Sequence, residues 1–87
     1  MSATTLLQFP TDYPFKVVGR AVGTLRESAD AIIRRHAPDL DSGRTVERLS
    51  AQGNFLSISY TIRAVSAAQV SALATELAAC ADVLLVI

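Results

Sequence analysis

The stretch NFLSISYTIRA, residues 54–64, carries the clearest alternation of apolar and polar side chains in the chain. The members that fall on one side are Leu56, Ile58, Tyr60 and Ile62, and the other side carries Phe55, Ser57, Ser59, Thr61 and Arg63. A period of two over this length predicts a β-strand with one face toward a core and the other face toward water.

The residues that flank this strand predict two more strands. Residues 51–53 are typical of a hairpin loop in which Gly53 has a positive φ, and we expect residues 44–50 to form the strand before it. Residues 15–20 also alternate, with Phe15, Val17 and Gly19 on one face and Lys16, Val18 and Arg20 on the other. Pro10 and Pro14 lack the N–H of a central strand, so we expect an N-terminal arm over residues 1–13 and a single domain over residues 14–87.

Two apolar stripes with a period of 3.6 residues predict helices. The first stripe follows a capping-box spacing at Thr24–Glu27, ends before Pro38, and consists of Leu25, Ala29, Ile32, Ile33 and His36. The second follows a capping-box spacing at Ser66–Gln69 and consists of Val70, Leu73, Leu77 and Ala81. After it, residues 83–87 are expected to form a short apolar strand.

The order β-α-β-β-α-β predicts an α+β, ferredoxin-like fold with a four-stranded antiparallel sheet in the order 4-1-3-2 and two helices on one face. We expect one core between the sheet and the helices. Its predicted members are Phe15, Val17, Leu25, Ile32, Ile33, Leu56, Ile58, Tyr60, Ile62, Val70, Leu73 and Leu77.

Composition limits the classes of partner. The 87 residues are 51% hydrophobic with a mean hydropathy of +0.36, more apolar surface than one small core hides, so we expect a homodimer. Eight Lys and Arg balance eight Asp and Glu, which argues against nucleic acid as a partner. The apolar run 83–87 is too short to span a membrane, and the lone Cys80 together with the lack of a signal-peptide pattern favours the cytoplasm.

No catalytic residue, metal site or cofactor is predicted, because no nucleophile elbow, phosphate-binding loop or cluster of metal ligands occurs in the sequence, and we therefore expect a protein that is not an enzyme. His36 lies on a helix stripe, where a structural role is favoured. Cys80 is interpreted as a small buried apolar residue, and Asp39 and Asp41 as turn residues beside Ser42 and Gly43.

The candidate ligand site is the loop after the first strand. Arg20, Gly23 and Thr24 would bring a guanidinium and the N-terminus of a helix together, which suits a small anionic metabolite or the acidic group of a partner protein. The alternative is a tight turn that needs Gly19 and Gly23 for its geometry alone.

The candidate interaction face comprises Lys16, Val18, Phe55, Ser57 and Ser59, on the polar side of the two central strands. Self-association through this face, with Ser and Thr pairing around Val18, is one interpretation. Weak RNA binding is another, but RNA-binding sheets stack bases on aromatic residues of both central strands, and here only Phe55 is available.

Three segments resemble the YbeD-like family of small bacterial proteins, for which no activity is established: FPTDYPFKVVG (9–19), RHAP (35–38) and SAQGNFLSIS (50–59). The resemblance runs from Phe9 to Ile87 and implies the same ferredoxin-like fold, although Ala51-Gln52 stands where relatives often carry Ser-Lys. Gly23 and Leu25 also match the loop of ACT domains, regulatory modules whose ligands bind beside that loop at a subunit interface. In those domains an acidic or amide residue commonly stands where this chain has Arg20.

The resemblances imply a small regulatory or adaptor module that acts through a partner protein or a bound small anion or metabolite. A homodimeric interaction protein without a ligand and a weak RNA-binding module remain the alternatives.

Overall fold

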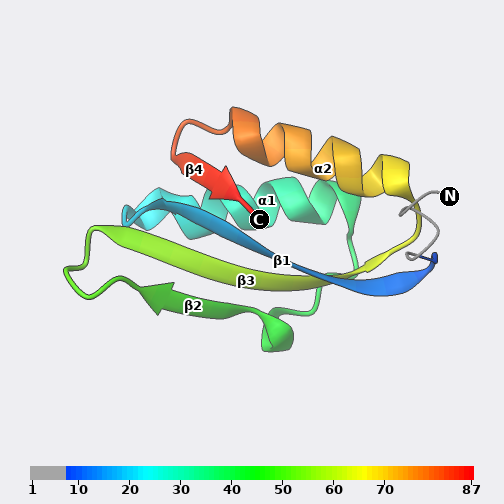
Figure 1. Ribbon diagram of the computed structural model, residues 1–87, viewed down its shortest axis with the longest axis horizontal. Helices are drawn as coiled ribbons and strands as arrows, with labels where there is room; N and C mark the ends of the chain where they lie inside the picture. The colour runs from blue at the N-terminus through cyan, green and yellow to red at the C-terminus, as the bar shows by residue number, and fades with distance from the viewer. Residues whose placement is uncertain (1–7) are drawn as a thin grey trace, which may run out of the picture.

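The computed structural model describes residues 8–87. Its elements in chain order are β1 (Thr11–Arg20), α1 (Gly23–His36), the short 3-10 helix η2 (Ser42–Arg44), β2 (Val46–Leu49), β3 (Phe55–Ala64), α2 (Ala67–Ala79) and β4 (Val83–Val86). The strands form one antiparallel sheet in the order β2-β3-β1-β4, which is the predicted order 4-1-3-2 read from the other edge. Figure 1 shows α1 and α2 running alongside each other, with β2 and β4 at opposite edges of the sheet. The predicted ferredoxin-like fold is confirmed.

Strand β1 begins earlier than its sequence indicates, because Thr11, Asp12 and Tyr13 pair with β3. The prediction that these residues belong to an arm is wrong. Lys16 exchanges backbone hydrogen bonds with Ile87 on the β4 side, and Pro14 faces the same side because it lies two residues away. No residue of β4 pairs with Pro14, so its missing N–H breaks no bond of the sheet. Residues 1–7 of the expected arm lie outside the described residues.

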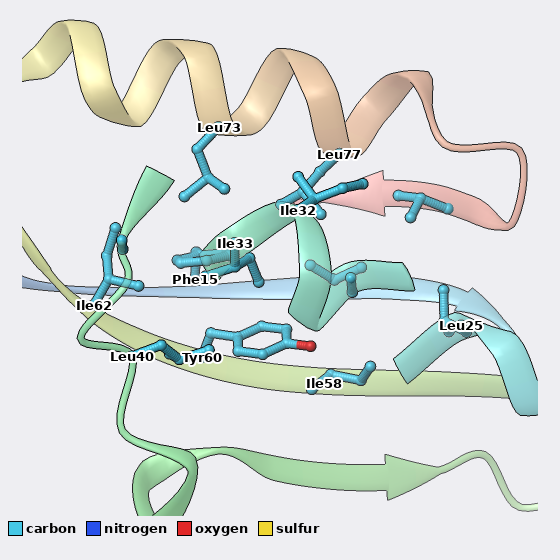
Figure 2. Packing of buried hydrophobic residues seen from close by; sticks show 14 of the residues in the cluster. Phe15, Leu25, Ile32, Ile33, Leu40, Ile58, Tyr60, Ile62, Leu73 and Leu77 are labelled. Atoms are coloured by element: carbon cyan, nitrogen blue, oxygen red, sulfur yellow. The ribbon is translucent and has the colours of Figure 1, made fainter. Parts of the chain in front are cut away.

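The core lies between the sheet and both helices, as predicted (Figure 2). Ten of the twelve predicted members are buried, while Leu56 and Val70 are partly buried and pack against the others. The core also contains five residues that the prediction did not include, namely Ala29, Ala37, Leu40, Ala64 and Val83. These are small residues or residues near the ends of elements, where periodicity gives little signal.

The two predicted capping boxes have different outcomes. At α2 the Ser66 hydroxyl accepts the Gln69 N–H at 3.1 Å, so the Ser66 cap is confirmed. The Gln69 side chain accepts the Val65 N–H at 2.7 Å, one residue before the cap amide that a capping box would use. At α1 the box is wrong, because the helix begins at Gly23 and no side chain caps it. Thr24 lies inside the first turn of α1 and donates its hydroxyl to Asp82 instead.

Strand β2 and helix α2 are shorter than predicted. Strand β2 covers only Val46–Leu49, because η2 occupies the start of the expected strand. Helix α2 ends at Ala79, with Cys80 as its C-cap. The hairpin prediction is confirmed, since Gly53 has a φ of 75°.

A polar network joins α1 to the sheet. The buried Tyr60 donates its hydroxyl to Asp30 at 2.6 Å, and Asp30 forms an ion pair with Arg26 at 3.0 Å. Arg26 also forms an ion pair with Glu47 of β2. Burial of the phenol, together with the hydrogen bond to Asp30, raises the pKa of Tyr60 well above its ordinary value of 10.0.

Tyr60→Phe is expected to lower the free energy of unfolding at neutral pH by about 1.5 kcal/mol, because a hydrogen bond to a carboxylate is lost. The unfolded chain ionises its tyrosines near pH ~10, whereas the folded chain keeps Tyr60 protonated. The contribution of Tyr60 to the free energy of unfolding is therefore complete below that pH. Above it, this contribution falls by about 1.4 kcal/mol per pH unit.

Urea unfolding of both proteins at neutral pH and above pH ~10 measures this difference. Tyr13→Phe is the control, because no hydrogen bond of the Tyr13 hydroxyl occurs within residues 8–87. An equal alkaline loss of stability in Tyr60→Phe and the parent protein would contradict the assignment.

Candidate interaction surface

The side of the sheet that faces away from the helices carries the predicted interaction residues. The register places Lys16 opposite Ser59, Val18 opposite Ser57 and Arg20 opposite Phe55. Directly opposite residues in an antiparallel pair share one face, so these side chains lie together. We call this side the open face, and it comprises Asp12, Pro14, Lys16, Val18, Arg20, Val46, Arg48, Phe55, Ser57, Ser59, Thr61, Arg63, Leu85 and Ile87.

The edge strands add residues to the open face that sequence patterning did not identify. Val46 and Arg48 of β2 lie opposite Ser59 and Ser57. Leu85 lies opposite Val18, and Ile87 exchanges hydrogen bonds with Lys16. A strand of four residues such as β2 or β4 is too short to show a period, so only the register places these side chains.

The open face exposes apolar surface from both edges and the centre. Val46 is 62% exposed, Leu85 51%, Ile87 67% and Phe55 44%. Two hollows mark the face, one of about 290 Å³ around Lys16 and Ser59 and one of about 420 Å³ around Val18 and Ser57. Exposed apolar side chains gathered on one face are typical of a surface that binds another molecule.

Charge on the open face is predominantly positive. Lys16, Arg20 and Arg48 are exposed and form no ion pair among residues 8–87. At one end of the face, Asp12 pairs with Arg44 at 3.3 Å and with Arg63 at 3.4 Å. The four side chains of this face that carry positive charge are therefore matched by a single carboxylate within the described chain.

At the predicted anion site, the structure places the carboxylate of Asp82, which the sequence pattern did not indicate. Gly23 and Thr24 form the first turn of α1, and the Thr24 hydroxyl donates to the Asp82 carboxylate at 3.1 Å. A carboxylate at this end of a helix is stabilised by the helix dipole. A small anion at this corner would meet the charge of Asp82, so binding there by Arg20, Gly23 and Thr24 stays a prediction. The contact was not foreseeable from the local pattern, because Asp82 lies 58 residues along the chain.

The two glycines of this loop have different roles. A Cβ at Gly19 would lie 2.3 Å from the carbonyl oxygen of Asp82, whereas a Cβ at Gly23 would meet no atom within 4 Å. Gly23 is therefore not required sterically. Gly19 is required, but for the close approach of β1 to Asp82 and not for a turn, because it lies within β1 and has no positive φ.

The remaining candidate residues make structural contacts. His36 Nε2 lies 2.7 Å from Glu76 Oε1, and Arg35 pairs with the same carboxylate, so they join α1 to α2. Asp41 accepts the Gly43 N–H at 2.9 Å, as expected of a turn residue, and Asp39 is exposed. Cys80 is partly buried against the core rather than fully buried.

No group of three His, Cys, Asp or Glu side chains within residues 8–87 is arranged to hold a metal ion. Neither helix of the range has both the length and the apolar character of a membrane span.

An apolar pocket that sequence patterning did not predict lies between α2 and the sheet. Its volume is about 140 Å³, and its lining residues are Tyr13, Phe15, Val70, Leu73, Ala74, Leu77, Val86 and Ile87. Tyr13 and Phe15 do alternate across Pro14, but the missing N–H of this proline predicts a strand that begins only after it. Ile87 belongs both to the pocket lining and to the open face.

The fold is that of a small ferredoxin-like domain. The structure is similar to the ACT domain from GTP pyrophosphokinase of Chlorobium tepidum, with a TM-score of 0.68 and 15% sequence identity over 88% of this chain and 97% of that chain. At this identity the similarity establishes the fold.

The chain belongs to the bacterial family described as "Protein of unknown function (DUF493)", which matches residues 4–87. A UPF0250 protein of Ectopseudomonas mendocina is 42% identical over 74 residues, which cover 84% of this chain and 80% of that protein. A UPF0250 protein of Nitrosomonas europaea is 33% identical over 73 residues, with 84% of each chain covered. UPF0250 protein YbeD of Salmonella arizonae is 42% identical over 72 residues, 83% of this chain and 80% of that protein. The expected resemblance to YbeD-like proteins and ACT domains is confirmed.

Proposed function

We propose that this protein is a small adaptor or regulatory module, not an enzyme, and that it acts in the cytoplasm by binding a partner protein on the open face. The observation that carries this proposal is the exposure of Val46, Phe55, Leu85 and Ile87 on a face that no helix covers. A soluble domain rarely leaves several large apolar side chains on one face without a binding role.

The polar side chains support binding over catalysis. His36 is held by Glu76, and Tyr60 is held by Asp30 in the core. Both contacts join structural elements, and Tyr60 is only 1% exposed. Groups that are occupied in this way hold the domain together and are poorly placed to reach a substrate.

The proposal is tested by photo-cross-linking in cells of the source bacterium. Benzoylphenylalanine is placed at Ser59, near the centre of the open face, and in a second protein at Ala31, which is exposed on α1. We expect a discrete adduct with one partner from position 59 and none from position 31. Absence of an adduct at position 59, or the same adducts from both positions, would contradict the proposal.

A homodimer is the second candidate, and the β4 edge of the sheet favours it. Leu84 is 50% exposed there, and a hollow of about 450 Å³ lies between α2 and β4. Edge strands such as β4 present unpaired backbone groups that a second copy can pair with. Two copies packed through their open faces would bring Lys16, Arg20 and Arg48 of each copy together, so the edge is the better candidate for self-association. This alternative predicts that light scattering gives a mass in solution of twice the 9.2 kDa chain mass.

A further inference from the structure

We propose that the partner presents an amphipathic acidic segment to the open face, with carboxylates that pair with Lys16, Arg20 and Arg48 and aliphatic side chains that cover Val46, Leu85 and Ile87. The inference rests on the proposed function and specifies the chemistry of the partner at the same surface.

The first observation is that the pairing of cations differs between the two sides of the molecule. On the helix side, Arg26 pairs with Asp30 and Glu47, and Arg35 pairs with Glu76. Arg34 forms no ion pair among the described residues, but it donates to the Leu40 carbonyl and the Ser42 hydroxyl. On the open face, Lys16, Arg20 and Arg48 form no ion pair within residues 8–87. The eight positive and eight negative residues therefore balance over the whole chain but are distributed unevenly, so that one face is basic.

The second observation is that these cations share one face of β1 and β2, the two strands that flank β3. Lys16 is opposite Ser59, whereas Arg48 is opposite Ser57, two residues away along β3. Arg20 lies two positions beyond Val18, whose own partner is Ser57. Like charges in one region raise the local potential, which attracts an acidic partner and rejects a basic one.

The third observation decides between a protein and a nucleic acid. Ile87 lies beside Lys16, and Val46 shares β2 with Arg48, so two of the three cations have an exposed aliphatic neighbour. Aliphatic side chains give a phosphate backbone little to bind, and bases stack on aromatic rings, of which the open face offers only Phe55 within residues 8–87. Acidic and aliphatic side chains on one segment complement both features.

The test uses a helical peptide with glutamates on one side and leucines on the other. Its binding to the full protein is followed by the backbone amide signals of the ¹⁵N-labelled protein. Two further probes are the same peptide with glutamine for every glutamate, and a single-stranded oligouridylate. We expect the acidic peptide to shift the signals of β1 and β3, and to bind at least about tenfold more tightly than the glutamine peptide.

The variant that tests the residues is Lys16→Gln/Arg20→Gln/Arg48→Gln. Its matched control is Ala31→Glu/Ala68→Glu/Ala72→Glu, which changes the net charge by the same amount at exposed positions of the two helices. We expect about tenfold weaker binding by the glutamine variant and a smaller loss in the control. Thermal melts establish that both variants are folded.

Three results would overturn the inference. These are the absence of shifts on β1 and β3 with the acidic peptide, an equal loss of affinity in the two variants, and tighter binding of the oligouridylate, which would assign the face to nucleic acid. If the position-59 cross-link persists in the glutamine variant, the proposed function holds and the acidic partner is wrong. If no cross-link forms in either background, both fail.

Discussion

Gly19→Ala is expected to lower the free energy of unfolding by about 3 kcal/mol, which is a fall in melting temperature on the order of 15 °C for a domain of this size. The added Cβ would lie 2.3 Å from the Asp82 carbonyl oxygen and 2.9 Å from a methyl group of Leu25. The first contact is with the backbone, at the position where the pairing of β1 with β4 changes register, so it cannot be relieved by a side-chain rotation. Thermal melting followed by circular dichroism measures the loss.

The matched control for Gly19→Ala is Gly23→Ala. A Cβ at Gly23 meets nothing within 4 Å, and alanine is a better residue than glycine within a helix. The control is therefore expected to melt at or slightly above the temperature of the parent protein. If Gly19→Ala has the same melting temperature as the parent protein, the close approach of β1 to the turn before β4 is contradicted.

Ile58→Ala is expected to cost about 2–5 kcal/mol, because it removes buried methyl groups from the central strand β3 and leaves a cavity. Ile58 is 0% exposed and lies between Val17 of β1 and Glu47 of β2 in the sheet register. Figure 2 shows its side chain in the layer between the sheet and the helices. Chemical denaturation of both proteins measures the difference.

Val46→Ala is the control on the opposite side of the sheet. Val46 is 62% exposed on the open face, and its truncation is expected to change stability by less than about 0.5 kcal/mol. A shift of one residue in the register would exchange the two faces of β3. Ile58 would then be exposed, and Ile58→Ala would lower the free energy of unfolding only slightly. A loss below about 0.5 kcal/mol at Ile58 would contradict the register, because it would place this residue on a surface.

The fold could be predicted because its signals are local. The alternation along β3 and the stripes of α1 and α2 each depend on residues that are close in sequence, and these patterns placed ten core residues correctly. The errors arose where a distant residue decides the local structure. Thr24 has the sequence of a cap, yet its hydroxyl is taken by Asp82, and Pro14 is tolerated because β4 does not reach it.

The candidate surface was only half predictable for a similar reason. The two central strands are long enough to show which side chains face away from the core, so Lys16, Val18 and Ser57 were placed correctly. The edge strands have four residues each, and Arg48 and Leu85 join the open face only through the register. The charge of the face was hidden as well, because a net charge of zero carries no information about where the charges lie.

We propose that the basic, partly apolar open face binds a partner. The test is photo-cross-linking from position 59 in two versions of the protein. One version keeps Lys16, Arg20 and Arg48, and the other has glutamine at all three positions. We expect a discrete partner adduct in the first background and its loss in the second. No adduct in the first background, or an undiminished adduct in the second, would contradict it.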